Sequence, residues 1–106
     1  MTRCYVVPGR VELVGKHVDY AGGRSLTCAV DLAITARADA LHTAVIRVQD
    51  AARRGTVEVP LRADAERKRG APRWRSYLLA VARRFARDFP HATTGVDIRL
   101  ASTLPS

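Results

Sequence analysis

The sequence predicts an α+β fold in which a helix covers one face of a sheet. Apolar and polar residues alternate through residues 26–38 and again through residues 95–101, which is typical of strands. Between them, from Pro72 to Phe89, apolar residues recur every three or four positions, which is typical of an amphipathic helix. Because several strands precede the helix and one follows it, the order favours α+β over a regularly alternating α/β fold.

The first elements are two short strands. Residues 5–7 form an apolar run that Pro8 and Gly9 are expected to stop, and residues 11–14 form a second strand before Gly15. After a turn at residues 22–23, residues 26–38 read as one long strand. Its expected buried face consists of alternating side chains: Cys28, Val30, Leu32, Ile34 and Ala36.

The middle of the chain is expected to form a hairpin and a connector. Residues 38–40 are expected to turn the chain so that residues 41–49 become the partner of the long strand. Residues 56–59 predict a short strand closed by Pro60, and residues 62–70 a charged connector.

The predicted helix begins near Pro72, which suits the first turn of a helix, and ends at Pro90. Its predicted core face comprises Trp74, Tyr77, Leu78, Val81, Phe85 and Phe89. The opposite face comprises Arg75, Ser76, Arg83 and Arg87. Residues 95–101 supply the last strand.

Composition narrows the class of protein. A chain of 106 residues that is 47% hydrophobic is at most one folded domain, and it contains no apolar run of the roughly 20 residues that a membrane helix needs. The first residues lack the apolar core of a signal peptide, so we expect a cytoplasmic protein whose Cys4 and Cys28 are free thiols. Three scattered histidines show no metal-ligand spacing, so no metal site is expected.

The net charge of +8 comes from 18 basic and 10 acidic residues, and most of the basic residues are arginines. A basic surface can indicate a nucleic-acid partner. Here the arginines are not interleaved with aromatic residues, which favours an ordinary solvated surface and no nucleic acid.

Residues 8–23 carry the chemistry of the chain. Glu12 and Asp19 can accept hydrogen bonds from hydroxyl groups, Arg10 and Lys16 can donate to phosphate or carboxylate, and His17 can do either. The spacing of glycines matches neither a Walker loop nor a dinucleotide fingerprint. The residues indicate a sugar or phosphate site, and the alternative is a surface turn with ordinary caps and salt bridges.

Residues 9–23, GRVELVGKHVDYAGG, resemble the galactokinase signature G-R-x-N-[LI]-I-G-E-H-x-D-Y of the GHMP kinases. Trp74 followed by Tyr77 resembles the start of a galactokinase helix, and residues 100–105 resemble the strand that leads into the ATP loop of that family. The resemblance implies a truncated GHMP kinase N-terminal fold, which is ribosomal-protein-like and contains a left-handed βαβ crossover.

The resemblance also implies roles. Arg10 would be catalytic, close to the transferred phosphoryl group, while His17 and Asp19 would bind sugar hydroxyls and Tyr20 would shape that pocket. Trp74 would lie beside the adenine of the nucleotide. An anchoring role for Trp74 in the core is the alternative.

Two positions depart from the signature. Glu12 replaces the usual asparagine, and Lys16 replaces the glutamate that binds the C6 hydroxyl of the sugar. Because an ammonium group prefers an anion where a carboxylate accepts from a hydroxyl, Lys16 is predicted to shift preference toward a sugar with an acidic C6 group.

Residues 1–106 are therefore interpreted as the N-terminal, sugar-binding part of an ATP-dependent galactokinase-like transferase in carbohydrate metabolism. The ATP loop, the catalytic aspartate and the C-terminal domain are expected to be absent, so ATP and Mg²⁺ would be bound mainly by other parts of a longer protein. The segment alone is expected to be inactive, with uncovered apolar faces. The alternatives are a non-catalytic sugar sensor and a basic nucleic-acid module.

Overall fold

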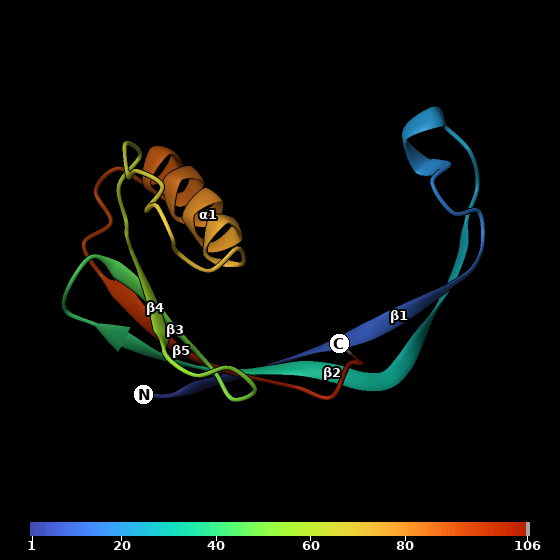
Figure 1. Cartoon of the computed structure of the whole chain (residues 1–106), viewed down its shortest axis with the longest axis horizontal. Coiled ribbons are helices and arrows are strands. Elements are labelled where there is room, and N and C mark those ends of the chain that lie inside the picture. Colours follow the sequence, from blue (N-terminus) through green and yellow to red (C-terminus); the bar gives the residue numbers. More distant parts are fainter. Residues whose placement is uncertain (106) are drawn as a thin grey trace.

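The computed structural model describes residues 1–105, and for Asp19 it describes the backbone only. The elements are β1 (Arg3–Val14), the short 3₁₀ helix η1 (Asp19–Ala21), β2 (Leu26–Leu41), β3 (Val45–Asp50), β4 (Thr56–Pro60), α1 (Arg75–Asp88) and β5 (Gly95–Ser102). The strands form one sheet in the order β1-β2-β5-β3-β4. In Figure 1, α1 covers the β3–β4 end of this sheet, while β1 and β2 extend away as a two-stranded ribbon with η1 at its far end. The expected α+β fold is confirmed.

The N-terminal residues form one strand and not the two that were expected. β1 pairs with β2 antiparallel from Arg3 opposite Ala38 to Val14 opposite Leu26, and the register shifts between Pro8 and Arg10. Proline cannot donate to a ladder, but it is tolerated at sheet edges and irregularities. β1 is an edge strand, so Pro8 interrupts the pairing without ending the strand.

The expected hairpin between the long strand and residues 41–49 is wrong. β2 continues to Leu41 and pairs antiparallel with β5, while β3 pairs antiparallel with β4 and parallel with β5. β5 thus lies between β2 and β3. Gly95 at the start of β5 permits this position, because a side chain there would overlap the backbone of Thr43 and Val45. β4 and α1 connect the parallel strands β3 and β5, and the left-handed sense of that crossover stays a prediction.

The predicted helix is present, but its predicted core face is only partly right, because Trp74 and Leu78 pack against the core while the other four residues are exposed. Leu79 and Ala82 are the buried residues of α1. Much of the expected face is exposed to solvent, including Tyr77 (73%), Val81 (60%) and Phe89 (58%). Apolar residues cover more of the circumference of this helix than the sheet can contact. The helix packs on the sheet through Leu79 and Ala82, because the small side chain of Ala82 allows a close approach there.

The core lies between α1 and the β3–β4 end of the sheet. It comprises Ile46, Val48, Val59, Ala65, Leu79 and Ala82, with Trp74, Leu78 and the inward residues of β5 packed partly against it. Arg83 donates a hydrogen bond of 2.6 Å to the carbonyl of Ala65, which ties the charged connector to the helix.

The ribbon has no such cover, so the expected buried face of β2 is wrong. Leu32 and Ile34 are 40% and 38% exposed, and both cysteines are free and exposed. The radius of gyration is 16.3 Å, against about 13 Å for a compact domain of this length. The expectation of uncovered apolar faces is confirmed. No helix in the described part of the chain is both long enough and apolar enough to span a membrane.

Candidate functional site

The candidate site is a cavity at the far end of the β1–β2 ribbon. Arg10 and Glu12 lie two residues apart on β1, so their side chains share one face of the strand. Thr27 lies opposite Glu12 on β2. With Ser25 and His17, these residues line a cavity of about 360 Å³, within the size range of small-ligand sites. All five lining residues are exposed, so the cavity opens to solvent.

The connection between β1 and β2 brings His17 to this cavity. The backbone adopts positive φ at Gly15 (93°) and at His17 (58°). Positive φ is uncommon for residues other than glycine, and such conformations cluster at functional sites. The amides of Ala21 and Gly23 both donate to the carbonyl of Val18, at 3.1 and 2.7 Å, which closes the turn that follows.

The structure gathers some of the predicted loop residues and not others. Arg10 and His17 line the cavity. Lys16 and Tyr20 are exposed and lie outside the lining, and Tyr20 is 80% exposed. The side chain of Asp19 lies outside the described part of the structure, so its role stays a prediction.

Trp74 lies elsewhere, at the N-terminal cap of α1. Its ring is partly buried against the core, and the guanidinium carbon of Arg53 lies 6.0 Å from the ring centre. These contacts agree with the anchoring alternative. They leave part of the ring open, and the adenine contact stays a prediction.

Sequence reasoning missed Ser25 and Thr27. Both are hydroxyl residues just outside the conspicuous glycine-rich stretch, and nothing local marks them as part of a site. The missing information is the strand register, because Thr27 enters the cavity only when it pairs with Glu12.

The cavity combines a cation, a carboxylate, an imidazole and two hydroxyls, so it can both donate and accept hydrogen bonds. The ion pairs among the described residues lie elsewhere: Arg47–Glu58, Arg53–Asp50, Arg62–Asp64 and Arg84–Asp88. Of these pairs, Arg62–Asp64 is bidentate, and its hydrogen bond from Arg62 holds the pKa of Asp64 below the usual value. None of these described ion pairs involves Arg10 or Glu12.

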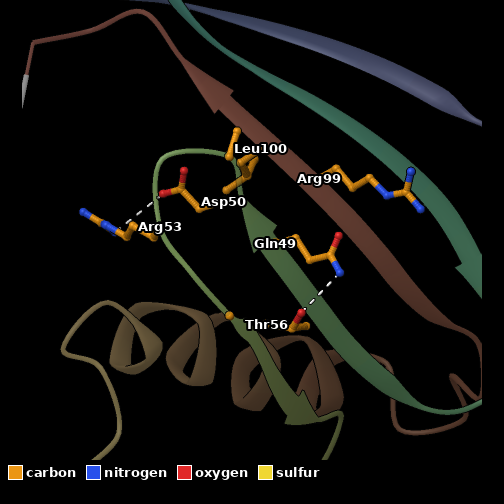
Figure 2. A pocket seen from close by; sticks show the side chains of 8 residues that line it. Gln49, Asp50, Arg53, Thr56, Arg99 and Leu100 are labelled. Carbon is orange, nitrogen blue, oxygen red and sulfur yellow. Dashed lines mark hydrogen bonds and ion pairs between the residues drawn. The ribbon is translucent and has the colours of Figure 1, made fainter.

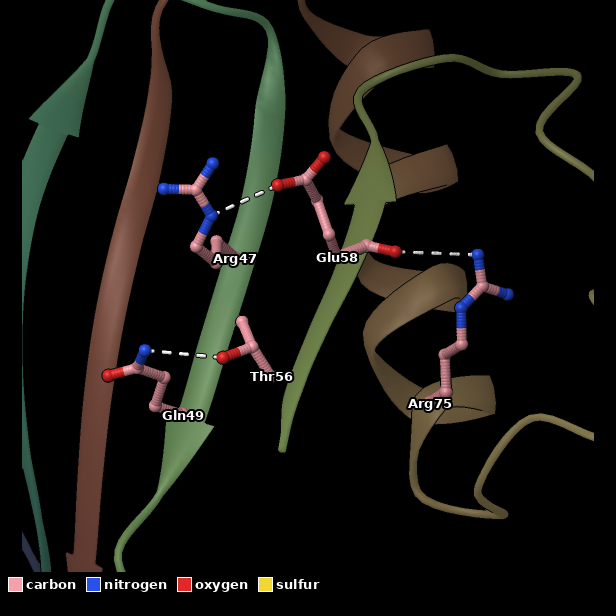
Figure 3. Close-up of polar contacts among 5 residues, drawn as sticks. All are labelled: Arg47, Gln49, Thr56, Glu58 and Arg75. Atoms are coloured by element: carbon pink, nitrogen blue, oxygen red, sulfur yellow. Dashed lines mark hydrogen bonds and ion pairs between the residues drawn. The ribbon is translucent and has the colours of Figure 1, made fainter. Parts of the chain in front are cut away.

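A second cavity of about 360 Å³ lies near the end of β3 (Figure 2). Its polar side chains largely bind one another: Gln49 donates to Thr56 at 3.2 Å, and Arg53 lies 3.8 Å from Asp50. Figure 3 shows a second cross-strand contact between β3 and β4, in which the guanidinium of Arg47 lies 3.0 Å from the carboxylate of Glu58. Arg75 of α1 reaches the carbonyl of Glu58 at 3.5 Å. These contacts join β3, β4 and α1, and we interpret them as structural.

Residues 2–39 match a family model described as the galactokinase galactose-binding signature. Galactokinase from Lacticaseibacillus casei (strain BL23) is 28% identical over 103 residues, which covers 95% of this chain and 26% of the relative. Galactokinase from Canis lupus familiaris is 34% identical over 83 residues, or 74% of this chain and 21% of the relative. The chain is galactokinase-like. It spans about a quarter of the length of these relatives.

Solved structures agree on the fold. Lactococcus lactis galactokinase, solved in complex with galactose, superposes with a TM-score of 0.79 at 18% identity over 99% of this chain and 27% of that chain. Methanococcus jannaschii mevalonate kinase gives a TM-score of 0.71 at 19% identity over 99% of this chain and 33% of that chain. The matched signature, residues 2–39, includes every residue of the candidate cavity.

Proposed function

We propose that the chain is the sugar-binding segment of a cytoplasmic, ATP-dependent sugar kinase, which transfers the γ-phosphoryl group of ATP to a sugar hydroxyl. One observation carries the proposal: the cavity of Arg10, Glu12, His17, Ser25 and Thr27 lies inside the stretch that matches the galactose-binding signature. The relative from Lactococcus lactis was solved with galactose, which supports a hexose of that class as the ligand.

The cavity residues would divide the work by their chemistry. His17, Glu12 and the hydroxyls of Ser25 and Thr27 would orient the sugar through its hydroxyl groups, with Asp19 as a further acceptor. Arg10 carries a permanent charge and donates in a fork that fits phosphate, so it would stabilise charge on the transferred phosphoryl group. We assign no aspartate of this chain as the base that activates the sugar hydroxyl.

ATP would supply the phosphoryl group, and Mg²⁺ would neutralise part of its charge. Within the described residues, no group of three or more histidine, cysteine, aspartate or glutamate side chains could hold a metal ion. We expect Mg²⁺ to be held mainly by the phosphates of ATP and by other parts of a complete kinase, and we derive no step through it. The exposed part of the Trp74 ring would contact the adenine. We expect the rest of the nucleotide to be held mainly by other parts of a complete kinase. The segment alone is expected to have no kinase activity.

A non-catalytic sugar sensor is the alternative function. The cavity is lined entirely by residues 10–27 and needs no nucleotide element to form. Such a site binds sugar without phosphorylating it. Sugar binding by a longer form that turns over no ATP favours this alternative.

The test is a titration of the 106-residue chain with D-galactose, in which NMR spectra report changes in the amide chemical shifts. Shifts are expected at residues 10–27, and His17→Ala is expected to abolish them. His42→Ala is the matched control, because His42 is also exposed but lies after β2 and outside the cavity. The proposal is wrong if D-galactose and other aldohexoses shift no cavity amide, or if the two histidine variants behave alike.

A further inference from the structure

The segment after β5 crosses the middle of the ribbon. The last β2–β5 pair is Ile34 opposite Ser102. Thr103 continues alongside β2, because its amide donates to the carbonyl of Ala33 at 3.0 Å and its hydroxyl accepts from the amide of Ala33 at 2.9 Å. Figure 1 shows the C-terminal end of the chain beside the middle of β1 and β2, away from α1. Residues 102–104 therefore join the packed half of the molecule to the ribbon.

Leu104 is seated on Gly9. A side chain on Gly9 would overlap Cδ2 of Leu104, and its Cβ would lie 3.2 Å from Cγ2 of Val30. The φ of Gly9 lies outside the left-handed region, so its backbone would accept any residue. A side chain at this position would therefore have to displace the tip of Leu104. Leu104 is half-buried there, whereas its neighbours Thr103 and Pro105 are exposed.

The contact lies beside an irregularity in the β1–β2 ribbon. The β1–β2 register shifts between Pro8 and Arg10, and Pro8 has no amide to donate to a ladder. Beyond this point the ribbon has neither β5 nor α1 beside it to hold its direction (Figure 1). Arg10, the residue after Gly9, begins the cavity.

We propose that Gly9 and Leu104 are a positioning pair. The missing side chain of Gly9 forms the slot for Leu104, and the seated Leu104, together with the Thr103–Ala33 bonds, fixes the direction of the ribbon beyond the register shift. This sets Arg10 and its cavity relative to the packed half of the molecule. The consequence for sugar binding rests on the proposed function, but the mechanical coupling does not.

A double-mutant cycle on the 106-residue chain tests the pair. Gly9→Ala is expected to displace Leu104, whose flexible tip is the atom in the way, and to speed amide exchange at Ala33 by roughly tenfold through local opening. Leu104→Ala is expected to speed exchange at Ala33 by the same factor. The double variant Gly9→Ala/Leu104→Ala is expected to exchange no faster than either single variant. Gly9→Ala with Leu104→Val restores slow exchange, because valine lacks the Cδ2 atom that overlaps the new methyl group. Val6→Ala, an exposed aliphatic residue on the same strand, is the control and changes nothing.

Two further readouts separate positioning from mere stability. Residual dipolar couplings of amides in β1 and α1 report the orientation of the ribbon relative to the helix. Gly9→Ala is expected to average this orientation, while amide protection at Ile46 and Val48 in the core stays at the wild-type level. Affinity for D-galactose is expected to fall about threefold or more, because loosening of β1 beyond Gly9 also loosens Glu12 in the cavity, and to recover with Leu104→Val.

The proposal is overturned if Gly9→Ala leaves exchange at Ala33 and the ribbon orientation unchanged, or if Leu104→Val does not rescue it. It is also overturned if affinity for D-galactose stays the same while the orientation changes. If the wild-type chain binds no sugar, the proposed function fails. The residual dipolar couplings still show whether Gly9 and Leu104 together fix the orientation of the ribbon.

Discussion

The uncovered apolar surface predicts self-association of the isolated chain. The accessible surface is 8679 Å², roughly 2,800 Å² more than a folded monomer of this mass exposes. A standard interface buries about 800 Å² on each partner, so the surplus is large enough for several contacts. The most exposed part of this surface on α1 includes Tyr77 and Val81.

The perturbation is the double substitution of Tyr77→Glu and Val81→Lys. These positions are 73% and 60% exposed, so folding should change by only about 0.5 kcal/mol each. The new side chains also form a favourable pair four residues apart and leave the net charge unchanged. An exposed tyrosine offers about 150 Å², worth up to about 4 kcal/mol on burial. Losing even a third of that weakens association about tenfold.

Sedimentation velocity at protein concentrations of roughly 1 to 100 µM, which bracket the dissociation constant of a weak self-association, measures the effect. Wild-type chain is expected to form oligomers that the double variant largely loses. Arg84→Gln, which alters an exposed polar position of the same helix, is the control. A wild-type chain that stays monomeric throughout, or a double variant that associates as strongly as wild type, refutes the reasoning.

Three other predictions concern the core, pH and substrate choice. Val59→Ala removes methyl groups from a side chain that is fully buried in the core and should lower the free energy of unfolding by about 2–3 kcal/mol in chemical denaturation. An unchanged denaturation midpoint contradicts the described core. Because Arg62 lowers the pKa of the exposed Asp64, the stabilisation by this pair is fully present above the ordinary value of 3.8 and declines below it. In thermal unfolding, wild type should therefore be slightly more stable than Asp64→Asn at pH 7. This difference in stability should vanish as the pH falls through the lowered pKa of Asp64. A difference that grows in acid would contradict the assigned sign. Lys16→Glu should shift the binding preference from galacturonate toward galactose in calorimetric titrations, and an unchanged ratio removes Lys16 from the specificity argument.

The local elements could be read from the sequence because their signals are local. Alternation marked the long strand and β5, and residue spacing marked α1. Arg10 and His17 were found because charged and aromatic nitrogen groups among glycines are conspicuous between strands.

The pairing of the strands could not be read in this way. Parallel pairing of β3 with β5 depends on Gly95, whose neighbours Thr43 and Val45 are distant in sequence. Ser25 and Thr27 entered the cavity only through strand register. The buried face of α1 depended on how closely Ala82 approaches the sheet, since apolar residues line more of that helix than one contact can cover.

The most direct test of the central claim is a chimera. Residues 1–106 would replace the aligned segment of the Lacticaseibacillus casei galactokinase, which matches 95% of this chain. We predict that the folded chimera phosphorylates a hexose with ATP, and that Arg10→Ala lowers its kcat by about 10²-fold or more without lowering its unfolding midpoint. A folded chimera that binds and phosphorylates no hexose, or one whose activity survives Arg10→Ala intact, would contradict the account.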